Sequence, residues 1–218
     1  MLKNNKILSE ILEWVLCLIV AIVIYLLLNY FVGTITGVKQ VSMYPTTKEG
    51  DRLVLQRPTI FKKDLNYGDI ITFLQPLNSY ATSVKDLDTT EAFTLDTAKA
   101  KYPQYEGINK FFHEFIGIGK VSYIKRIIGL PNDHIIIAEN GEVLRNGEVL
   151  EEPYLNGSKT NQNGKFINVI VPEGHIYVMG DNRKESSDSR FFGCVPIEKI
   201  DGYVITRIWP FDKIGKIN

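Results

Sequence analysis

Three distant stretches of the chain carry residue types that could together support acyl transfer. Ser42 lies in the turn-like segment Ser42-Met43-Tyr44-Pro45-Thr46 and offers a hydroxyl. Lys125 lies in the mostly apolar stretch Tyr123–Pro131, and residues 180–190 hold further hydroxyl and charged side chains. A serine hydroxyl becomes a strong nucleophile only beside a group that removes its proton. The sequence therefore has to be searched for that base.

Lys125 is the first candidate base. A lysine amine can take a proton only if its pKa falls from above ten towards neutrality, and burial among apolar groups lowers it because desolvation disfavours the ammonium. Ile124, Ile127 and Ile128 surround Lys125 in the sequence. Taken alone, however, the spacing favours a simpler interpretation, in which Lys125 and Arg126 are the charged residues of an ordinary amphipathic strand.

The stretch Gly180–Arg190 is too polar for a buried strand. Its density of aspartates and arginines indicates a loop ordered by its own ion pairs, such as Asp188 with Arg190 or Asp181 with Arg183. A rigid loop of this kind could supply a hydroxyl that orients a neutral lysine amine. A solvated turn is the alternative.

Other catalytic chemistries find little support in the sequence. The histidines are His113, His134 and His175, and no Gly-x-Ser-x-Gly segment accompanies them as a hydrolase nucleophile would require. Cys17 and Cys194 are distant from each other, and no HExxH spacing occurs, so no ligand cluster for a metal is indicated. The sequence predicts no metal, no cofactor and no disulfide framework.

The formal net charge is zero, with 25 basic and 25 acidic residues among 218. A balanced charge gives no electrostatic footprint for nucleic acid, so we expect no nucleic-acid partner.

A long apolar run, Trp14–Val32, contains Asn29 as its only strongly polar residue. As a helix it would span roughly 28 Å, close to the hydrocarbon thickness of a bilayer. A cleaved signal peptide is the alternative, but the run is longer than its usual apolar region. We expect a short N-terminal segment over 1–10, a transmembrane helix over 11–32 and a soluble domain over 33–218. The flanking lysines favour an N-terminus in the cytoplasm only slightly.

The soluble part is expected to be mainly β, built as antiparallel sheets, because short β-rich runs follow turn residues throughout it. Residues 75–121 do not follow this β pattern. We expect a partly helical insertion there, with weak helices at 86–101 and 109–116. The insertion would act as a cap, a lid or a partner surface, or else form a mobile loop. Two segments, Gly50–Gln56 and Tyr67–Leu74, are each expected to form a turn followed by a strand. The other expected strands are Val38–Val41, Ser122–Ile128, a hairpin of 135–138 with 143–145, Ile167–Val171, His175–Met179 and Gly202–Trp209.

The three stretches taken together resemble the type I signal peptidases, the serine-lysine membrane endopeptidases, and follow that family's order after one N-terminal anchor. The tail around Ile208-Trp209-Pro210-Phe211 is similar to that of Gram-positive-like members. The matching segments are Ser42-Met43-x-Pro45-Thr46, Gly50-Asp51, Tyr67-Gly68-Asp69-Ile70, Lys125–Pro131, and Gly180-Asp181-Asn182-Arg183 continuing to Ser186, Asp188, Ser189 and Arg190.

By this resemblance Ser42 is the nucleophile and Lys125 the general base, while the Ser42 backbone N–H serves the oxyanion hole. A hydroxyl would orient the Lys125 amine, and an ion pair would hold the loop that carries it. The residues implied in these supporting roles are Ser186, Asp188, Arg190 and Asp181.

The resemblance also implies which substrates the protein cleaves and where in the cell it acts. Met43 and Ile124 would help to form shallow apolar pockets for small side chains, chiefly Ala-x-Ala before the cleaved bond. The expected partners are signal-peptide-bearing preproteins, the bilayer, and secretion machinery or pilins, with the enzyme as a monomer in the cell membrane. The fold would place two antiparallel sheet regions on the outer face of the membrane, with the N-terminus in the cytoplasm.

The sequence departs from the family pattern in three places. Gln40 stands where relatives carry a small residue, Asn132 replaces a glycine, and the 75–121 insertion separates the serine and lysine stretches. These departures leave open a specialised or catalytically idle relative that assists pilin or surface-fibre assembly. A serine-lysine autoprotease of the repressor class is a further rival, although the apolar run argues against it.

Overall fold

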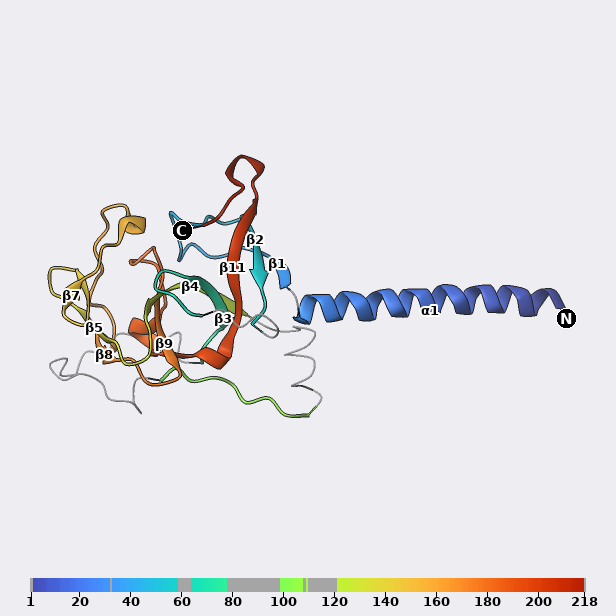
Figure 1. Cartoon of the computed structure of the whole chain (residues 1–218), viewed down its shortest axis with the longest axis horizontal. Helices are drawn as coiled ribbons and strands as arrows, with labels where there is room; N and C mark the ends of the chain where they lie inside the picture. Colours follow the sequence, from blue (N-terminus) through green and yellow to red (C-terminus); the bar gives the residue numbers. More distant parts are fainter. Residues whose placement is uncertain are drawn as a thin grey trace.

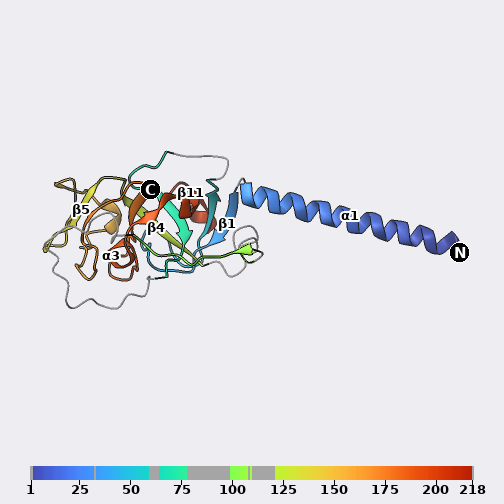
Figure 2. The same cartoon turned by 90° about the horizontal axis from the view of Figure 1, so that it is seen from below.

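A computed structural model of the chain describes residues 2–31, 33–58, 64–77, 99–107, 109 and 121–217. One long helix, α1 (Leu2–Phe31), projects from a β domain formed by the later residues (Figure 1). The view from below shows the same arrangement, with β1 beside the C-terminal end of the helix (Figure 2).

Helix α1 is apolar on all sides over most of its length, and its large side chains, such as Trp14 and Leu18, are exposed. The segment Lys6–Asn29 is long and apolar enough to cross a membrane, and none of its most apolar window is buried against the domain. A helix of this composition gains nothing from water contact, so a bilayer is the surrounding that suits it.

A seven-stranded antiparallel sheet forms the larger part of the domain, in the order β1-β2-β11-β3-β4-β9-β10. Strand β4 is central, between β3 and β9, and all but its first residue are buried. The alternation expected for a strand with one wet face is therefore absent, because both faces of β4 are covered. The strands are β1 (Gly33–Gly37), β2 (Arg52–Gln56), β3 (Ile70–Leu74), β4 (Ser122–Gly129), β9 (His175–Met179), β10 (Val195–Pro196) and β11 (Ile200–Trp209).

A smaller sheet, in the order β7-β6-β5-β8, packs at the end of the domain away from α1 (Figure 1). Its tight turn between β6 and β7 uses Asn146 and Gly147, both with positive φ, as two-residue hairpin loops require. The strands are β5 (His134–Ile137), β6 (Val143–Arg145), β7 (Glu148–Val149) and β8 (Asn168–Ile170). Short helical turns complete the domain: η2 (Pro153–Leu155), α3 (Ser189–Phe192), η3 (Ile197–Lys199) and η4 (Phe211–Lys213).

Three clusters of buried apolar side chains hold the domain together. One lies around the small sheet, and a second fills the space between β3, β4, β9 and α3. The third, with Met43, Leu53, Ile70 and Ile124 among its members, joins the serine-bearing segment to β2, β3 and β4. The third cluster therefore fixes the position of Ser42 relative to the strand that carries Lys125.

The expected mainly β, antiparallel architecture with one N-terminal apolar helix is confirmed, and so are its central strands. The expected strand Val38–Val41 is wrong: the strand is β1, Gly33–Gly37, which pairs with β2 in the register Gly33↔Gln56 to Gly37↔Arg52. Val38 still exchanges backbone hydrogen bonds with Asp51 and Gly50, and residues 39–41 then lead out of the ladder to Ser42.

The predicted helices at 86–101 and 109–116 lie for the most part outside the described residues. Within the insertion, Lys99 forms a parallel bridge with Cys194, and Ala100 is buried in the second cluster. This described portion packs on the domain. The proposed cap or lid role of the insertion remains a prediction.

Candidate active site

Ser42 and Lys125, which are far apart in the sequence, meet inside the domain. The Lys125 Nζ lies 2.7 Å from the Ser42 Oγ and 3.0 Å from the Ile124 carbonyl oxygen. Lys125 is held by β4, where it pairs with Ile71 of β3, and it is 1% exposed. A neutral amine in this position can donate to the Ile124 carbonyl and accept the Ser42 proton with its lone pair.

Burial lowers the pKa of Lys125 to about 8, because desolvation disfavours the ammonium. Asp188 and Asp181 oppose this shift through their negative charges, and Arg190 adds to it. At pH 7 about a tenth of the Lys125 amines would be neutral, against about one in 2,500 for an exposed lysine. The site therefore contains a usable base at physiological pH.

The segment that carries Ser42 is fixed by the loop that follows β9. The Asn182 backbone N–H donates to the Ser42 carbonyl at 3.0 Å, and the Asn182 side chain donates to the Val41 carbonyl at 3.2 Å. The Thr46 hydroxyl donates to Asp181 at 2.5 Å. These bonds hold both ends of the turn, so the Ser42 side chain is presented in one position.

Asp181 also holds the strand that carries Lys125. Its two carboxylate oxygens accept from Arg126 Nε at 2.9 Å and from Arg126 Nη2 at 2.7 Å, with both side chains almost fully buried. The Arg126 guanidinium lies over the Tyr154 ring, 4.0 Å from its centroid. One carboxylate thus connects β4, through Arg126, to the Ser42 turn, through Thr46.

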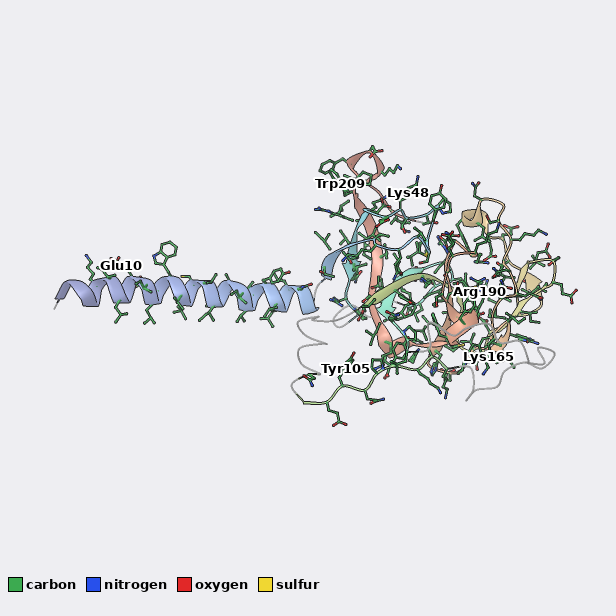
Figure 3. The ribbon with its side chains drawn as sticks, turned by 180° about the vertical axis from the view of Figure 1, so that it is seen from behind. Glu10, Lys48, Tyr105, Lys165, Arg190 and Trp209 are labelled. Atoms are coloured by element: carbon green, nitrogen blue, oxygen red, sulfur yellow. The ribbon has the colours of Figure 1, made fainter. Side chains whose placement is uncertain are left out.

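A buried ion pair orders the polar loop. Asp188 accepts from Arg190 Nε at 2.8 Å and Nη2 at 2.9 Å, and both side chains are fully buried. Figure 3 shows Arg190 within the domain, whereas Lys48 and Trp209 lie at its rim. Burial alone would raise the pKa of Asp188, but Arg190 and the Gly180 N–H hold it below its usual range.

The expected pairing of Asp181 with Arg183 is wrong. Arg183 instead forms an ion pair with Glu152, reinforced by Thr160, while Asp181 binds Arg126. Arg183 therefore links the polar loop to Glu152, next to η2, while its Nε donates to the Gly180 carbonyl within the loop.

Ser186 is buried near the site, and the resemblance implies that it orients the Lys125 amine. In the described structure no hydrogen bond joins the two side chains. Ser186 does lie beside the serine turn: a Cβ added at Gly180 would collide with both the Ser186 side chain and the Ser42 carbonyl. The loop therefore requires glycine at position 180 to approach Ser42 this closely.

A groove with a volume of about 390 Å³ lies beside this pair, and its lining includes Gln40 and Ile124, which are close to Ser42 and Lys125 in the chain. One wall is formed by β1 and residues 38–40. Another is formed by Ser122 and Ile124 of β4 and by Val121, which precedes this strand. Ile124 lines the groove, whereas Met43 is fully buried beneath it in the third cluster. In the part of the chain that the structure describes, the Ser42 backbone N–H donates to no acceptor.

The histidines described here have structural partners. His134 contacts Asn168 at 2.7 Å, and His175 contacts the Glu173 carbonyl at 2.9 Å. His113 lies outside the described residues. Within the described ranges no three histidine, cysteine or acidic residues gather closely enough to hold a metal ion.

Comparison with known proteins agrees with this geometry. The family described as "Signal peptidase, peptidase S26" matches residues 11–209. The chain belongs to this family. A probable signal peptidase I-1 of Synechocystis sp. is 32% identical over 92% of this chain and 83% of its own length. Signal peptidase IB of Staphylococcus aureus is 27% identical over 94% of this chain and 93% of its own.

A crystal structure of a signal peptidase I from Enterococcus faecalis is 23% identical, covers 65% of this chain and 97% of its own, and gives a TM-score of 0.39. Family membership and the single long apolar helix together indicate a membrane-anchored protein.

Sequence reasoning missed the roles of Arg126, Thr46 and Asn182, although all three lie in segments that match the family. The sequence alone predicts Arg126 only as the charged residue of an amphipathic strand. Its function depends on the β4–β9 register, which sets Arg126 opposite Met179, two residues before Asp181. Nothing in the local sequence signals that pairing.

Proposed function

We propose that this chain is a membrane-bound serine endopeptidase that cleaves N-terminal signal peptides from exported preproteins after small residues. The observation that carries the proposal is the 2.7 Å contact between Ser42 Oγ and a fully buried Lys125 amine whose pKa falls to about 8. Family membership supports the same activity.

In the first half-reaction, neutral Lys125 takes the Ser42 proton as the Oγ attacks the carbonyl carbon of the scissile bond. The Ser42 backbone N–H, which has no acceptor among the described groups, donates to the developing oxyanion. The C–N bond then breaks, and the Lys125 ammonium returns its proton to the leaving amine. The mature chain departs, and the signal peptide remains as an ester on Ser42.

In the second half-reaction, Lys125 removes a proton from water, and the resulting hydroxide attacks the ester carbonyl. The C–O bond to Ser42 breaks, and Oγ recovers the proton from Lys125. The products are a free signal peptide with a carboxylate end and the regenerated Ser42 hydroxyl.

The groove suits an extended substrate segment. Lys39 and Gln40 form no backbone hydrogen bonds in the described structure, so they can pair with an added strand. Ile124 and the shallow wall beside it leave room for small side chains next to the cleaved bond. Small residues before that bond are what signal peptides provide.

We place the N-terminus in the cytoplasm and residues 33–218 on the outer face, where preproteins emerge, with the enzyme acting as a monomer. Support for this orientation comes from the activity itself, since the flanking charges are nearly balanced. Dedicated pilin substrates and contacts with secretion machinery remain hypotheses about the insertion. A catalytically idle relative is not favoured, because Ser42 and Lys125 are both present and in contact.

The direct test uses the full-length protein in liposomes with a membrane-inserted preprotein. Ser42→Ala should lower kcat/KM at least about 10³-fold, because the variant loses the hydroxyl that contacts Lys125 and would form the ester. Ser158→Ala, at an exposed serine, is the matched control and should cleave normally. Mass spectrometry of acid-quenched enzyme should find the signal peptide attached to Ser42. Normal processing by Ser42→Ala would refute the proposal.

A further inference from the structure

A second groove, with a volume of about 500 Å³, lies between the end of α1 and the edge of the large sheet. Its walls include Tyr25 and Leu28 of α1, Ile35 of β1 and Val54 of β2. No charged side chain is among its described lining residues. The exposed fractions of Tyr25, Leu28 and Ile35 are 64%, 55% and 62%, so this apolar surface has no partner within the described chain.

The second groove adjoins the first groove. Thr34, Ile35 and Leu55 line both, so β1 forms a shared wall. Figures 1 and 2 both show β1 directly beside the C-terminal end of α1. The two grooves together extend along β1, from Gln40 and Ile124 in the first groove to Tyr25 and Leu28 of the membrane helix in the second.

The spacing between Ile35 and Gln40 along the chain matches the layout of a signal peptide. An extended chain advances about 3.3 Å per residue, so a substrate paired along Ile35 to Gln40 would cover about 17 Å. The substrate residue five or six positions before the cleaved bond would then lie beside Ile35. Signal peptides carry their apolar region, of about 7–15 residues, upstream of a short small-residue cleavage segment.

The second groove also lies at the correct depth for that apolar region. The candidate membrane span of α1 ends at Asn29, and Leu28 precedes it directly. A substrate that leaves the bilayer at this level would bring the end of its apolar helix against Tyr25 and Leu28. Burial of apolar surface against an uncharged wall favours such an occupant over a polar peptide.

We propose that the second groove binds the C-terminal end of the signal peptide's apolar helix against α1. This inference rests on the proposed function. Helix α1 then selects substrates as well as anchoring the enzyme, and it favours membrane-inserted preproteins over short peptides that carry only the cleavage segment.

The test compares Leu28→Trp with Leu27→Trp in the full-length protein in liposomes. Leu27 lies at the same depth but does not line the groove, and tryptophan is well accepted at membrane interfaces. Each variant is assayed on a membrane-inserted preprotein and on a soluble peptide that spans only the cleavage segment. The measured quantity is the ratio of the two kcat/KM values.

Filling the groove with the Leu28→Trp indole should lower that ratio about 5–10-fold, as loss of one partly buried apolar contact would. Leu27→Trp should change it less than about 2-fold. Equal ratios in the two variants would overturn the inference. If the wild-type protein cleaves neither substrate, the proposed function fails first.

A second measurement leaves the groove residues unchanged. A preprotein with a photo-activated benzoylphenylalanine at the end of its apolar region is bound to the Ser42→Ala protein and irradiated. The inference predicts cross-links to residues 25–29 of α1. Cross-links confined to the β domain, with none to α1, would contradict it.

Discussion

Lys125→Met is expected to lower kcat/KM for a preprotein at least about 10³-fold, the upper part of the range for loss of a general base that also activates the nucleophile. Methionine fills a similar volume and leaves Ser42 without a proton acceptor. Lys125→Arg should be as inactive, because a guanidinium keeps its proton at any pH the protein tolerates. Lys159→Met, at an exposed lysine, is the control and should retain full activity.

The Lys125 prediction separates catalysis from folding. Burying an amine costs free energy, so Lys125→Met should leave the melting temperature unchanged or higher. Loss of activity together with loss of the folded state would point to a structural role. Retained cleavage by either Lys125 variant would exclude the amine as the base.

The second large effect is on stability. Asp188→Ala removes one partner of a fully buried ion pair and leaves the Arg190 guanidinium without its carboxylate. Breaking such a pair costs about 3–5 kcal/mol in the free energy of unfolding. Denaturant titration in detergent micelles should detect the loss, and a domain of this size would melt about 10 °C lower.

Two companion variants test the cause of that loss. Glu198→Ala breaks an exposed pair with Lys199 and should change the free energy of unfolding by less than about 0.5 kcal/mol. The double variant Asp188→Leu with Arg190→Met removes both charges and should recover part of the stability. A stability of Asp188→Ala equal to that of the wild type would contradict the structural role of the pair.

The pH dependence of this stabilisation has a definite sign. The folded-state pKa of Asp188 lies below its ordinary value, so the folded state favours the carboxylate. The contribution is therefore complete above the ordinary aspartate pKa of about 3.9. It is lost as the pH falls through the lower, folded-state pKa.

Local sequence features predicted those parts of the fold that depend on neighbouring residues. The β5–β6 hairpin follows from β-rich runs on either side of Asn140-Gly141, and the strand around Lys125 follows from its flanking isoleucines. The family motifs, taken in their order along the chain, predicted that Ser42 and Lys125 act together. No single motif could do so, because each alone fits an ordinary turn or strand.

The parts of the fold and the site that the sequence does not predict depend on contacts between residues far apart in the chain. Asp181 has Arg183 two residues away, yet it binds Arg126, because the β4–β9 register brings that guanidinium within reach. Glu152, the partner of Arg183, lies in a segment with no recognisable signal. The predicted position of the first strand is wrong because β1 is fixed by its pairing with β2, which lies on the other side of the turn that contains Ser42.

The central claim is that a neutral Lys125 amine activates Ser42. The measurement that tests it most directly is the pH dependence of kcat/KM for the short peptide, with the full-length enzyme. Because only the neutral amine can take the proton, the rate should rise about tenfold per pH unit at low pH and level off above an apparent pKa of about 8. A rate that is constant between about pH 6 and 9, or that still rises beyond the ordinary lysine pKa of about 10.4, would contradict the claim.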